Sequence, residues 1–220
     1  DLTQCRIAGV PRVALVGDSH ADALFYGFLN SGHPLYAQAL VMSRAGCQPA
    51  LAGDTAPCVS HMRYVLGELR ARETVEVVVI TGNSRFAEQN ADLQPFVNGY
   101  AELIGGLRAA GKRVVLVADV PHVPFEPDDC VRSRAFPRTF EDPLCSAFPP
   151  PARPEYDAFL ARLTARVDGL VLFDPRSLFC DAAGCHAFLD GVAQYKDGDH
   201  LSHAGSERVA AALIASLEGT

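Results

Sequence analysis

Five short apolar runs, separated by segments with helical periodicity, constrain the fold of this chain more than any other feature. The runs are nearly continuous in β-branched and aliphatic residues, which is typical of strands buried on both faces of a parallel sheet. We expect strands over residues 12–16, 36–43, 75–80, 113–118 and 169–173, and helices over residues 21–29, 62–72, 93–110, 155–167 and 202–217. This order predicts a three-layer α/β/α fold with a central, mainly parallel five-stranded sheet.

A length of 220 residues suits one domain with a sizeable core, so we expect a single domain over residues 1–220. The formal net charge of −7 argues against a broad basic face for nucleic acid or anionic lipid. No apolar run approaches the roughly 20 residues of a membrane-spanning helix, and no signal peptide opens the chain. Because the chain starts abruptly at Asp1, we expect a domain excised from a longer protein.

Six of the seven cysteines form three sequence-local pairs, each in a connector rich in Pro, Gly or Asp. Such pairs are typical of disulfides that fix loops in an oxidising compartment, whereas buried cytosolic thiols usually lie within core elements. We therefore expect the disulfides Cys47–Cys58, Cys130–Cys145 and Cys180–Cys185. A structural zinc site is the alternative, although the C-x2-C spacing typical of such sites is absent. Cys5 is left over, and it either pairs with an upstream cysteine or stays free.

The longest irregular stretch, residues 119–153, holds two of these cysteines and most of a proline cluster. A loop of this length in a compact domain is usually functional or stapled. We expect a disulfide-stapled loop insertion there, which is a candidate cover for a second substrate.

Four segments with polar residues or glycine lie next to the predicted strands. Gly17-Asp18-Ser19 follows the first strand, Arg44–Cys47 the second and Thr81–Ser84 the third, while Asp197–His203 precedes the last helix. Open parallel sheets bind ligands at the carboxyl ends of their strands, near a topological switch point. We therefore expect the four segments to converge on one edge of the sheet.

Ser19, Asp197 and His200 have the residue types and spacing of a catalytic triad. A serine hydroxyl needs a base to remove its proton, and the base needs a group that fixes its tautomer. In a turn, a three-residue spacing lets the Asp197 carboxylate reach Nδ1–H of His200, so that Nε2 faces Ser19. We expect Asp199 to be misplaced for this role, because adjacent side chains usually diverge, and we interpret His203 as structural or peripheral. The alternative interpretation of Ser19 is a helix N-cap.

We expect three hydrogen-bond donors for an oxyanion: the backbone N–H groups of Ser19 and Gly46, and the side-chain amide of Asn83. A glycine has no Cβ to block close approach of its backbone, although an ordinary turn glycine is the alternative at Gly46. We interpret Asp18 as holding the turn through side chain-to-backbone hydrogen bonds. We interpret His20 as a polar residue at a helix start rather than a substrate contact.

In this order along the chain, the segments resemble the sequence blocks of the SGNH (GDSL-like) hydrolases. The first block matches Gly17-Asp18-Ser19, the glycine block matches Gly46, and the last block matches Asp197-Gly198-Asp199-His200. In the asparagine block, usually Gly-x-Asn-Asp, Asn83 is present but the flanking Gly and Asp are replaced by Thr81 and Ser84. The resemblance covers residues 17–200. It implies the flavodoxin-like fold of that family, with catalytic Ser19, Asp197 and His200 and an oxyanion hole at Ser19, Gly46 and Asn83.

A narrower resemblance is to the extracytoplasmic SGNH domains fused behind bacterial membrane acyltransferases, which O-acetylate surface glycans such as the O-antigen of lipopolysaccharide. It rests on "GDSHADAL", "GCQP", the paired loop cysteines and "DGDHLSHAG". It implies a location at the periplasmic face of the bacterial inner membrane, C-terminal to a membrane acyltransferase domain. The membrane part would bring the acetyl group of acetyl-CoA, and this domain, with no cofactor of its own, would pass it to a hydroxyl of the glycan acceptor.

Three other functions stay open at this point. A carbohydrate O-acetyl esterase would use the same triad with water in place of the sugar, so the triad residues do not separate the two reactions. A glycan-binding module without activity is disfavoured because Ser19, Asp197 and His200 are all present. Metal-dependent phosphoester chemistry is disfavoured because the sequence shows no carboxylate and histidine cluster at ligand spacing, and we expect no metal site.

Overall fold

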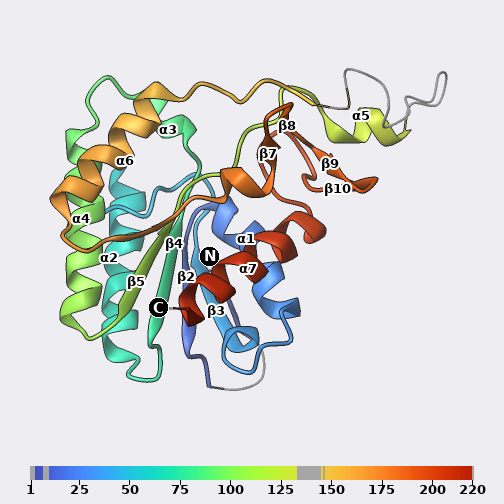
Figure 1. Ribbon diagram of the computed structural model, residues 1–220. Coiled ribbons are helices and arrows are strands. Elements are labelled where there is room, and N and C mark those ends of the chain that lie inside the picture. The colour runs from blue at the N-terminus through green and yellow to red at the C-terminus, as the bar shows by residue number, and fades with distance from the viewer. Residues whose placement is uncertain (1–2, 7–9, 133–144, 146, 220) are drawn as a thin grey trace.

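The computed structural model describes residues 3–6, 10–132, 145 and 147–219. Its centre is a six-stranded sheet in the order β1-β3-β2-β4-β5-β6, with helices on both faces (Figure 1). The strands are β1 (Thr3–Arg6), β2 (Val13–Gly17), β3 (Ala39–Ser43), β4 (Val77–Thr81), β5 (Arg113–Val117) and β6 (Val171–Phe173). Strands β2 to β6 are parallel, and β1 pairs antiparallel with β3. The predicted three-layer fold with five parallel strands is confirmed, with one further edge strand.

Two sets of helices cover the sheet (Figure 1). One face packs against α1 (Ser19–Asn30) and α7 (His203–Glu218), and the other against α2 (Ala56–Ala71), α4 (Gln94–Ala109) and α6 (Pro154–Arg166). Val13 and Leu15 of β2 belong to the hydrophobic core under α1 and α7, and Ala14 and Val16 belong to the core under α2, α4 and α6. Successive side chains of a strand point to opposite faces, so a sheet covered on both sides needs the nearly continuous apolar runs that the sequence contains.

Short elements decorate this framework. They are α3 (Arg85–Gln89), α5 (Pro127–Arg132) and the two hairpins β7 (Cys180–Asp181) with β8 (Gly184–Cys185) and β9 (Phe188–Leu189) with β10 (Val192–Ala193). None was predicted, because elements this short carry too little periodicity to be recognised. None of the helices within the described ranges combines the length and the apolar character needed to cross a membrane.

Several predicted boundaries differ from the structure. Residues 36–38 form a 3-10 helix before β3, so the strand expected over 36–43 is shorter than predicted. Helix α1 begins at Ser19 rather than at residue 21, and its N-cap is Asp18, whose side chain accepts a hydrogen bond from the His20 N–H. Ser202 caps α7 by accepting a hydrogen bond from the Gly205 N–H. Ser19 is therefore a residue of the first helical turn and is not the N-cap.

The structure contains three disulfides, at the pairs expected from the sequence: Cys47–Cys58, Cys130–Cys145 and Cys180–Cys185. The first links the loop after β3 to α2, and the third closes the β7–β8 hairpin. The zinc alternative for these six cysteines is therefore set aside. The central part of the loop predicted over residues 119–153, residues 133–144 and 146, lies outside the described residues.

The strand order places a switch point above β2 and β4. From β2 the chain moves to β3 on one side, and from β3 it crosses to β4 on the other side of β2. Polar segments that follow β2 and β4 therefore meet at one edge of the sheet. At this edge a Cβ on Gly17 would lie 1.9 Å from the Thr81 backbone oxygen, so the last residue of β2 has room only for glycine.

Candidate active site

Ser19 lies at the switch point, two residues after the end of β2 and in the first turn of α1. Its Oγ is 2.8 Å from Nε2 of His200, although 181 positions separate the two residues in the sequence. The Ser19 backbone N–H has no hydrogen-bond partner among the described residues. The first N–H groups of a helix are unpaired and carry the positive end of its dipole, which favours negative charge at this point.

Asp197 holds the other side of the His200 ring. Nδ1 of His200 is 3.0 Å from both carboxylate oxygens of Asp197. Oδ1 also accepts the backbone N–H groups of Asp199 and His200, at 3.1 and 2.7 Å. Burial raises the pKa of Asp197, but these N–H groups and the His200 ring outweigh it and lower the pKa below its usual range. The carboxylate is thus ionised and keeps the His200 proton on Nδ1, so that Nε2 is free to accept the Ser19 proton.

Asp199 lies closer to His200 than we expected. Its Oδ1 is 2.9 Å from Nδ1 of His200, an ion-pair contact beside the hydrogen bonds to Asp197. Its Oδ2 accepts a hydrogen bond from Nδ2 of Asn83 at 3.0 Å and pairs with Nη1 of Arg85 at 3.2 Å. The expectation that Asp199 diverges from its neighbour was wrong, because the tight turn at residues 197–200 brings both carboxylates to the same ring nitrogen.

Gly46 lines the same cleft as Ser19 and lies in the loop after β3. Its φ is +73° and a Cβ there would meet no atom within 4 Å, so the left-handed backbone rather than lack of space explains the glycine. Its N–H, like that of Ser19, has no partner within the described part of the chain. Gly46, Ser19 and Asn83 line the same cleft, which has a volume of about 480 Å³.

The Asn83 amide is fully engaged in this structure. Its Nδ2 is 3.0 Å from Nε2 of His20 and 3.0 Å from Oδ2 of Asp199, so each of its two N–H groups has a partner when Nε2 of His20 is unprotonated. Its Oδ1 accepts the Arg85 backbone N–H at 2.8 Å, which fixes the orientation of the amide. Ser19 and Gly46, whose backbone N–H groups have no partner among the described residues, line the cleft, while the side-chain nitrogen of Asn83, the third predicted donor, contacts His20 and Asp199.

Asp18 has the structural role expected of it. One carboxylate oxygen accepts the His20 N–H at 2.9 Å, and the other accepts the Asn83 N–H at 2.8 Å. Gln48 also contacts it at 3.4 Å. Burial raises the pKa of Asp18. The side chain therefore ties the start of α1 to the loop after β4 and fixes the relative positions of Ser19 and Asn83.

His20 is buried and paired with Asp119, which the sequence did not lead us to expect. Nδ1 of His20 is 2.8 Å from Oδ1 of Asp119, and the centres of the His20 and His200 rings are 4.8 Å apart. Burial lowers the pKa of His20, but the Asp119, Asp18 and Asp199 carboxylates outweigh it and raise the pKa to about 9. His20 does lie in the first turn of α1, as interpreted, but its burial and its pairing with Asp119 were not expected. Asp119 is the first polar residue after the buried end of β5, as Asp18 is after β2, and this pattern could have identified it.

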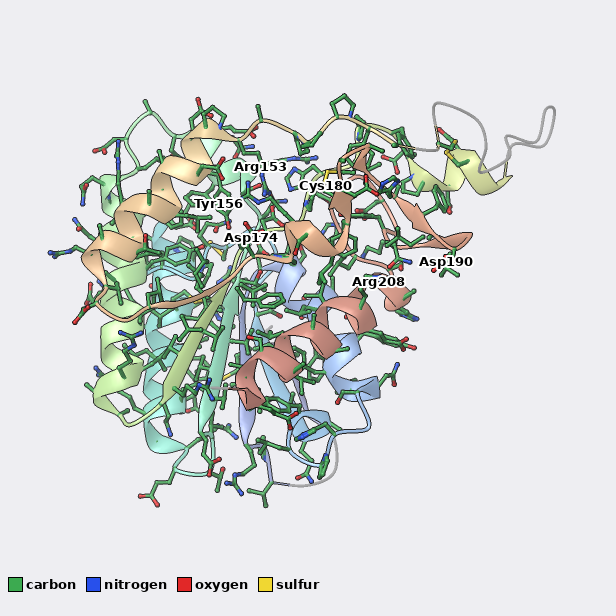
Figure 2. The ribbon with its side chains drawn as sticks, viewed as in Figure 1. Arg153, Tyr156, Asp174, Cys180, Asp190 and Arg208 are labelled. Atoms are coloured by element: carbon green, nitrogen blue, oxygen red, sulfur yellow. A yellow bond between two sulfur atoms is a disulfide. The ribbon has the colours of Figure 1, made fainter. Side chains whose placement is uncertain are left out.

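Several groups surround Asp119. Its Oδ2 accepts the Ser84 backbone N–H at 2.7 Å and lies 2.8 Å from Nε2 of His122. Arg153 and Tyr156 come from the start of α6 and lie close together (Figure 2), with the Arg153 guanidinium 5.1 Å from the centre of the Tyr156 ring. The Tyr156 hydroxyl accepts the Asp119 N–H, and Arg153 donates to the Asp119 carbonyl. Asp119 is thus a rigid, buried anchor, and its cationic and hydrogen-bonding partners keep its pKa far below the usual range against the effect of burial.

Two further sequence expectations concern histidines. His203 is exposed and stacks on Tyr26, with ring centres 3.4 Å apart, which agrees with a peripheral role. His20, Asp199 and His200 place potential metal-ligand atoms within 4.8 Å of one another, a grouping that the sequence spacing does not show, and the expectation of no metal site stays a prediction. Strand order, not sequence spacing, brings these three together. Each of them already contacts other protein groups at this edge of the sheet.

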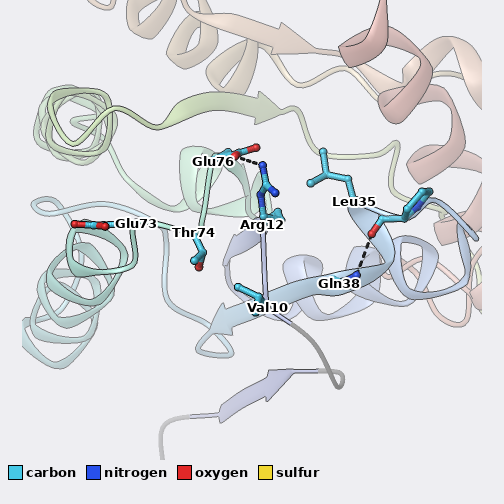
Figure 3. Close-up of a pocket in the computed structure, with 8 residues that line it drawn as sticks. Val10, Arg12, Leu35, Gln38, Glu73, Thr74 and Glu76 are labelled. Atoms are coloured by element: carbon cyan, nitrogen blue, oxygen red, sulfur yellow. Dashed lines mark hydrogen bonds and ion pairs between the residues drawn. The ribbon is translucent and has the colours of Figure 1, made fainter.

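A larger hollow of about 640 Å³ lies at the opposite end of the sheet, near the start of β2 (Figure 3). Its lining includes the ion pair between Arg12 and Glu76. No serine, cysteine or histidine is among its described lining residues. The cleft beside Ser19 is therefore the candidate active site, because it contains the nucleophile and its base.

The chain was compared with known families and structures. It matches the family described as "SGNH domain (fused to AT3 domains)" over residues 1–215. It is similar to the periplasmic domain of a lipopolysaccharide acetyltransferase from Salmonella ser. Paratyphi A, with 16% identity and a TM-score of 0.73 over 97% of this chain and 86% of that one. It is also similar to Est24, a carbohydrate acetylesterase from Sinorhizobium meliloti, with 16% identity and a TM-score of 0.55 over 94% and 99% of the two chains.

An aryl esterase from M. smegmatis has 15% identity and a TM-score of 0.55, over 95% of this chain and 99% of that one. At these identities the structural matches show a shared fold. Comparison with curated protein sequences finds no match. The family match spans nearly the whole sequence, and the chain therefore belongs to the family of SGNH domains that are fused to AT3 domains.

Proposed function

We propose that this domain transfers an acetyl group, through a covalent serine intermediate, to a hydroxyl of a bacterial cell-surface polysaccharide. The observation that carries the proposal is the alignment of Ser19 Oγ, the His200 ring and the Asp197 carboxylate, with contacts of 2.8 and 3.0 Å. Membership of a family of SGNH domains fused to AT3 domains supports acyl transfer. The similar folds of a lipopolysaccharide acetyltransferase domain and a carbohydrate acetylesterase support a glycan as the acceptor.

The reaction has two halves. In the first, His200 Nε2 takes the Ser19 proton as Oγ attacks the donor carbonyl, and the tetrahedral intermediate collapses when the leaving group departs with that proton. In the second, His200 removes the proton of a sugar hydroxyl, which attacks the acetyl-Ser19 ester. The sugar ester forms, the bond to Ser19 breaks, and Ser19 regains its proton. Asp197 stabilises the imidazolium form of His200 in both halves.

The oxyanion in each half is stabilised by N–H groups that face the cleft. The backbone N–H groups of Ser19 and Gly46 have no partner in the described part of the chain, and the start of α1 adds the positive end of its dipole. Loss of one such donor typically costs about 10²–10³ in rate. Asn83 is the proposed third donor, after one of its two N–H groups leaves its present partner.

The acceptor site is the cleft beside Ser19. One wall is the loop between Cys47 and Cys58, and the other is α3 with the residues that follow it. Its polar lining includes Asp54, Thr55, Arg85, Gln89 and Asn90. Carboxylate, amide and guanidinium groups are suited to the closely spaced donors and acceptors of sugar hydroxyls.

We propose the cellular setting from the family membership. An AT3 domain in the same protein supplies the acetyl group, with acetyl-CoA as its ultimate source, and the SGNH domain acts on the glycan without a cofactor of its own. The protein is anchored in the bacterial inner membrane and this domain, over residues 1–220, lies on the periplasmic side. Its fold likeness to a periplasmic acetyltransferase domain and its three disulfides support this placement.

A carbohydrate O-acetyl esterase is the second candidate. The same three residues would serve it, with water as the second nucleophile. The observation that favours it is the openness of the cleft, where Gly46 and Arg85 are exposed, so that water reaches the acyl-serine.

Turnover of a small acetyl ester tests the proposal. The purified domain is compared with Ser19→Ala and with Ser60→Ala, an exposed serine on α2 that serves as the matched control. We expect ester cleavage by the wild type and Ser60→Ala but not by Ser19→Ala. With an oligosaccharide acceptor present, acetyl transfer to the sugar at the expense of acetate supports the transferase, and acetate alone supports the esterase. Equal rates in wild type and Ser19→Ala would refute the serine mechanism.

A further inference from the structure

One buried ionisable pair has no task in the mechanism above. The side chains of His20 and Asp119 are 6% and 1% exposed, and they lie 2.8 Å apart next to the catalytic residues. The free nitrogen of His20, Nε2, contacts Nδ2 of Asn83 at 3.0 Å. A buried ion pair is costly to desolvate. This pair also contacts Asn83, a residue that lines the catalytic cleft, and this contact suggests a role for the pair in the reaction.

The direction of the Asn83 amide is fixed by two other contacts. Its oxygen accepts the Arg85 backbone N–H, and one of its N–H groups donates to Asp199. The amide therefore presents an N–H, and not its oxygen, to His20. This contact is a hydrogen bond only while Nε2 of His20 is unprotonated, because a second proton on the ring would place two donors face to face.

We propose that His20, held by Asp119, is a positioning residue that sets whether Asn83 can donate a hydrogen bond to the oxyanion. With one proton, on Nδ1 facing Asp119, the ring accepts from Asn83 and the amide stays fully engaged. With a second proton, on Nε2, the ring no longer accepts, and one Asn83 N–H turns to the cleft shared with Ser19 and Gly46. The inference rests on the proposed serine acyl transfer.

The charges around His20 favour the doubly protonated ring. Three carboxylates from different elements surround the ring: Asp119 after β5, Asp18 before α1 and Asp199 before α7. The basic side chains nearby are His200, His122 and Arg85, and each of them pairs with Asp119 or Asp199, which reduces its effect on His20. A pKa of about 9 for His20 means that Asn83 is available at neutral pH and withheld in alkali.

A double-mutant cycle tests whether His20 acts through Asn83. In His20→Gln the new amide can donate to Asp119 and accept from Asn83 at every pH, so it imitates the singly protonated ring. At pH 7 we expect about a 30-fold loss of kcat with little change in KM for His20→Gln, and about a 100-fold loss for Asn83→Ala. The double variant should match Asn83→Ala within about 3-fold. If the two losses multiply instead, His20 does not act through Asn83.

The pH dependence of kcat separates this positioning role of His20 from a purely structural one. Wild-type kcat, corrected with a Ser19→Ala blank, should fall as pH rises through about 9, and His20→Gln should lack that fall. The matched control is His33→Gln. His33 pairs with Glu218 beyond the C-terminal end of α1, far from the cleft, and this variant should keep the wild-type pH profile. An alkaline fall of the same size in His20→Gln would overturn the inference.

A measurement without turnover separates this inference from the proposed function. The side-chain amide signal of Asn83 is identified by its loss in Asn83→Ala and followed by NMR from pH 6 to 10.5. We expect it to shift together with the His20 ring signal, while the amide of Asn98 on α4 stays constant. An Asn83 signal that does not respond to the His20 titration refutes the inference. A coupled shift together with failure of the Ser19 assay refutes the proposed function and leaves the His20–Asn83 coupling established.

Discussion

Asp197 and Asp199 both contact Nδ1 of His200, and this arrangement predicts how much activity is lost when either carboxylate is removed. In Asp197→Asn the new side-chain oxygen can still accept the Asp199 and His200 backbone N–H groups, now at 3.1 and 2.7 Å, so the turn survives. What is lost is one charge-assisted hydrogen bond to His200, which is worth about 1.5–3 kcal/mol. At about 1.4 kcal/mol per tenfold, we expect a loss of about 10²-fold in kcat/KM. The loss stays below the roughly 10⁴-fold known where a single aspartate orients the base, because Asp199 remains 2.9 Å from Nδ1.

Asp199→Asn should cost about 10-fold, since Asp199 makes an ion-pair contact while Asp197 accepts the hydrogen bonds. Removing both carboxylates should cost about 10⁴-fold, more than the product of the single losses, because neither residue can then replace the other. The assay is hydrolysis of a chromogenic acetyl ester, with a Ser19→Ala blank and thermal melting of each variant as the control for folding. If Asp199→Asn were the more damaging single change, the assignment of Asp197 as the orienting carboxylate would be wrong.

Three further predictions concern stability. Gly17→Ala should destabilise the protein by about 3 kcal/mol or more, measured by urea unfolding, because its Cβ would lie 1.9 Å from the Thr81 oxygen; a change below 1 kcal/mol would contradict the close approach of β2 and β4. Replacing Cys47 and Cys58 by serine should cost about 2–4 kcal/mol and lower the melting temperature; an unchanged melting temperature would show that the link adds no stability. The pKa of His20 is raised from 6.5 to about 9 in the folded state, so its contribution to the free energy of unfolding is full below pH 6.5 and is lost as pH rises through 9. Between pH 6 and pH 10 the wild type should therefore lose an amount on the order of 3 kcal/mol more stability than His20→Gln does.

The sequence was sufficient to predict the framework and the triad candidates. Strand and helix positions follow from periodicities of two and 3.6 residues, and these are local properties of the chain. The three disulfides were also recognisable, because each pair lies within one connector. Asp197 and His200 are three residues apart, so a single turn brings them together whatever the rest of the fold does.

Other features could not be predicted because they depend on which strands are neighbours. Asp119 follows β5 and His20 follows β2, and β4 lies between those strands, so sequence distance gives no sign that the two side chains meet. Asp199 was misjudged for a different reason. The general divergence of adjacent side chains is overcome here by a tight turn that is held by backbone hydrogen bonds.

By itself, then, the sequence determined the layers of the fold, the place of Ser19 at a strand-to-helix junction and the spacing of its candidate base and carboxylate, because all of these arise from local backbone geometry. Only the tertiary structure brought His20 and Asp199 within hydrogen-bonding distance of the Asn83 side-chain nitrogen. The physical reason is that the availability of a hydrogen-bond donor depends on every group within about 3 Å of it. In this protein those groups arrive from the ends of different strands, brought together by the order of the sheet.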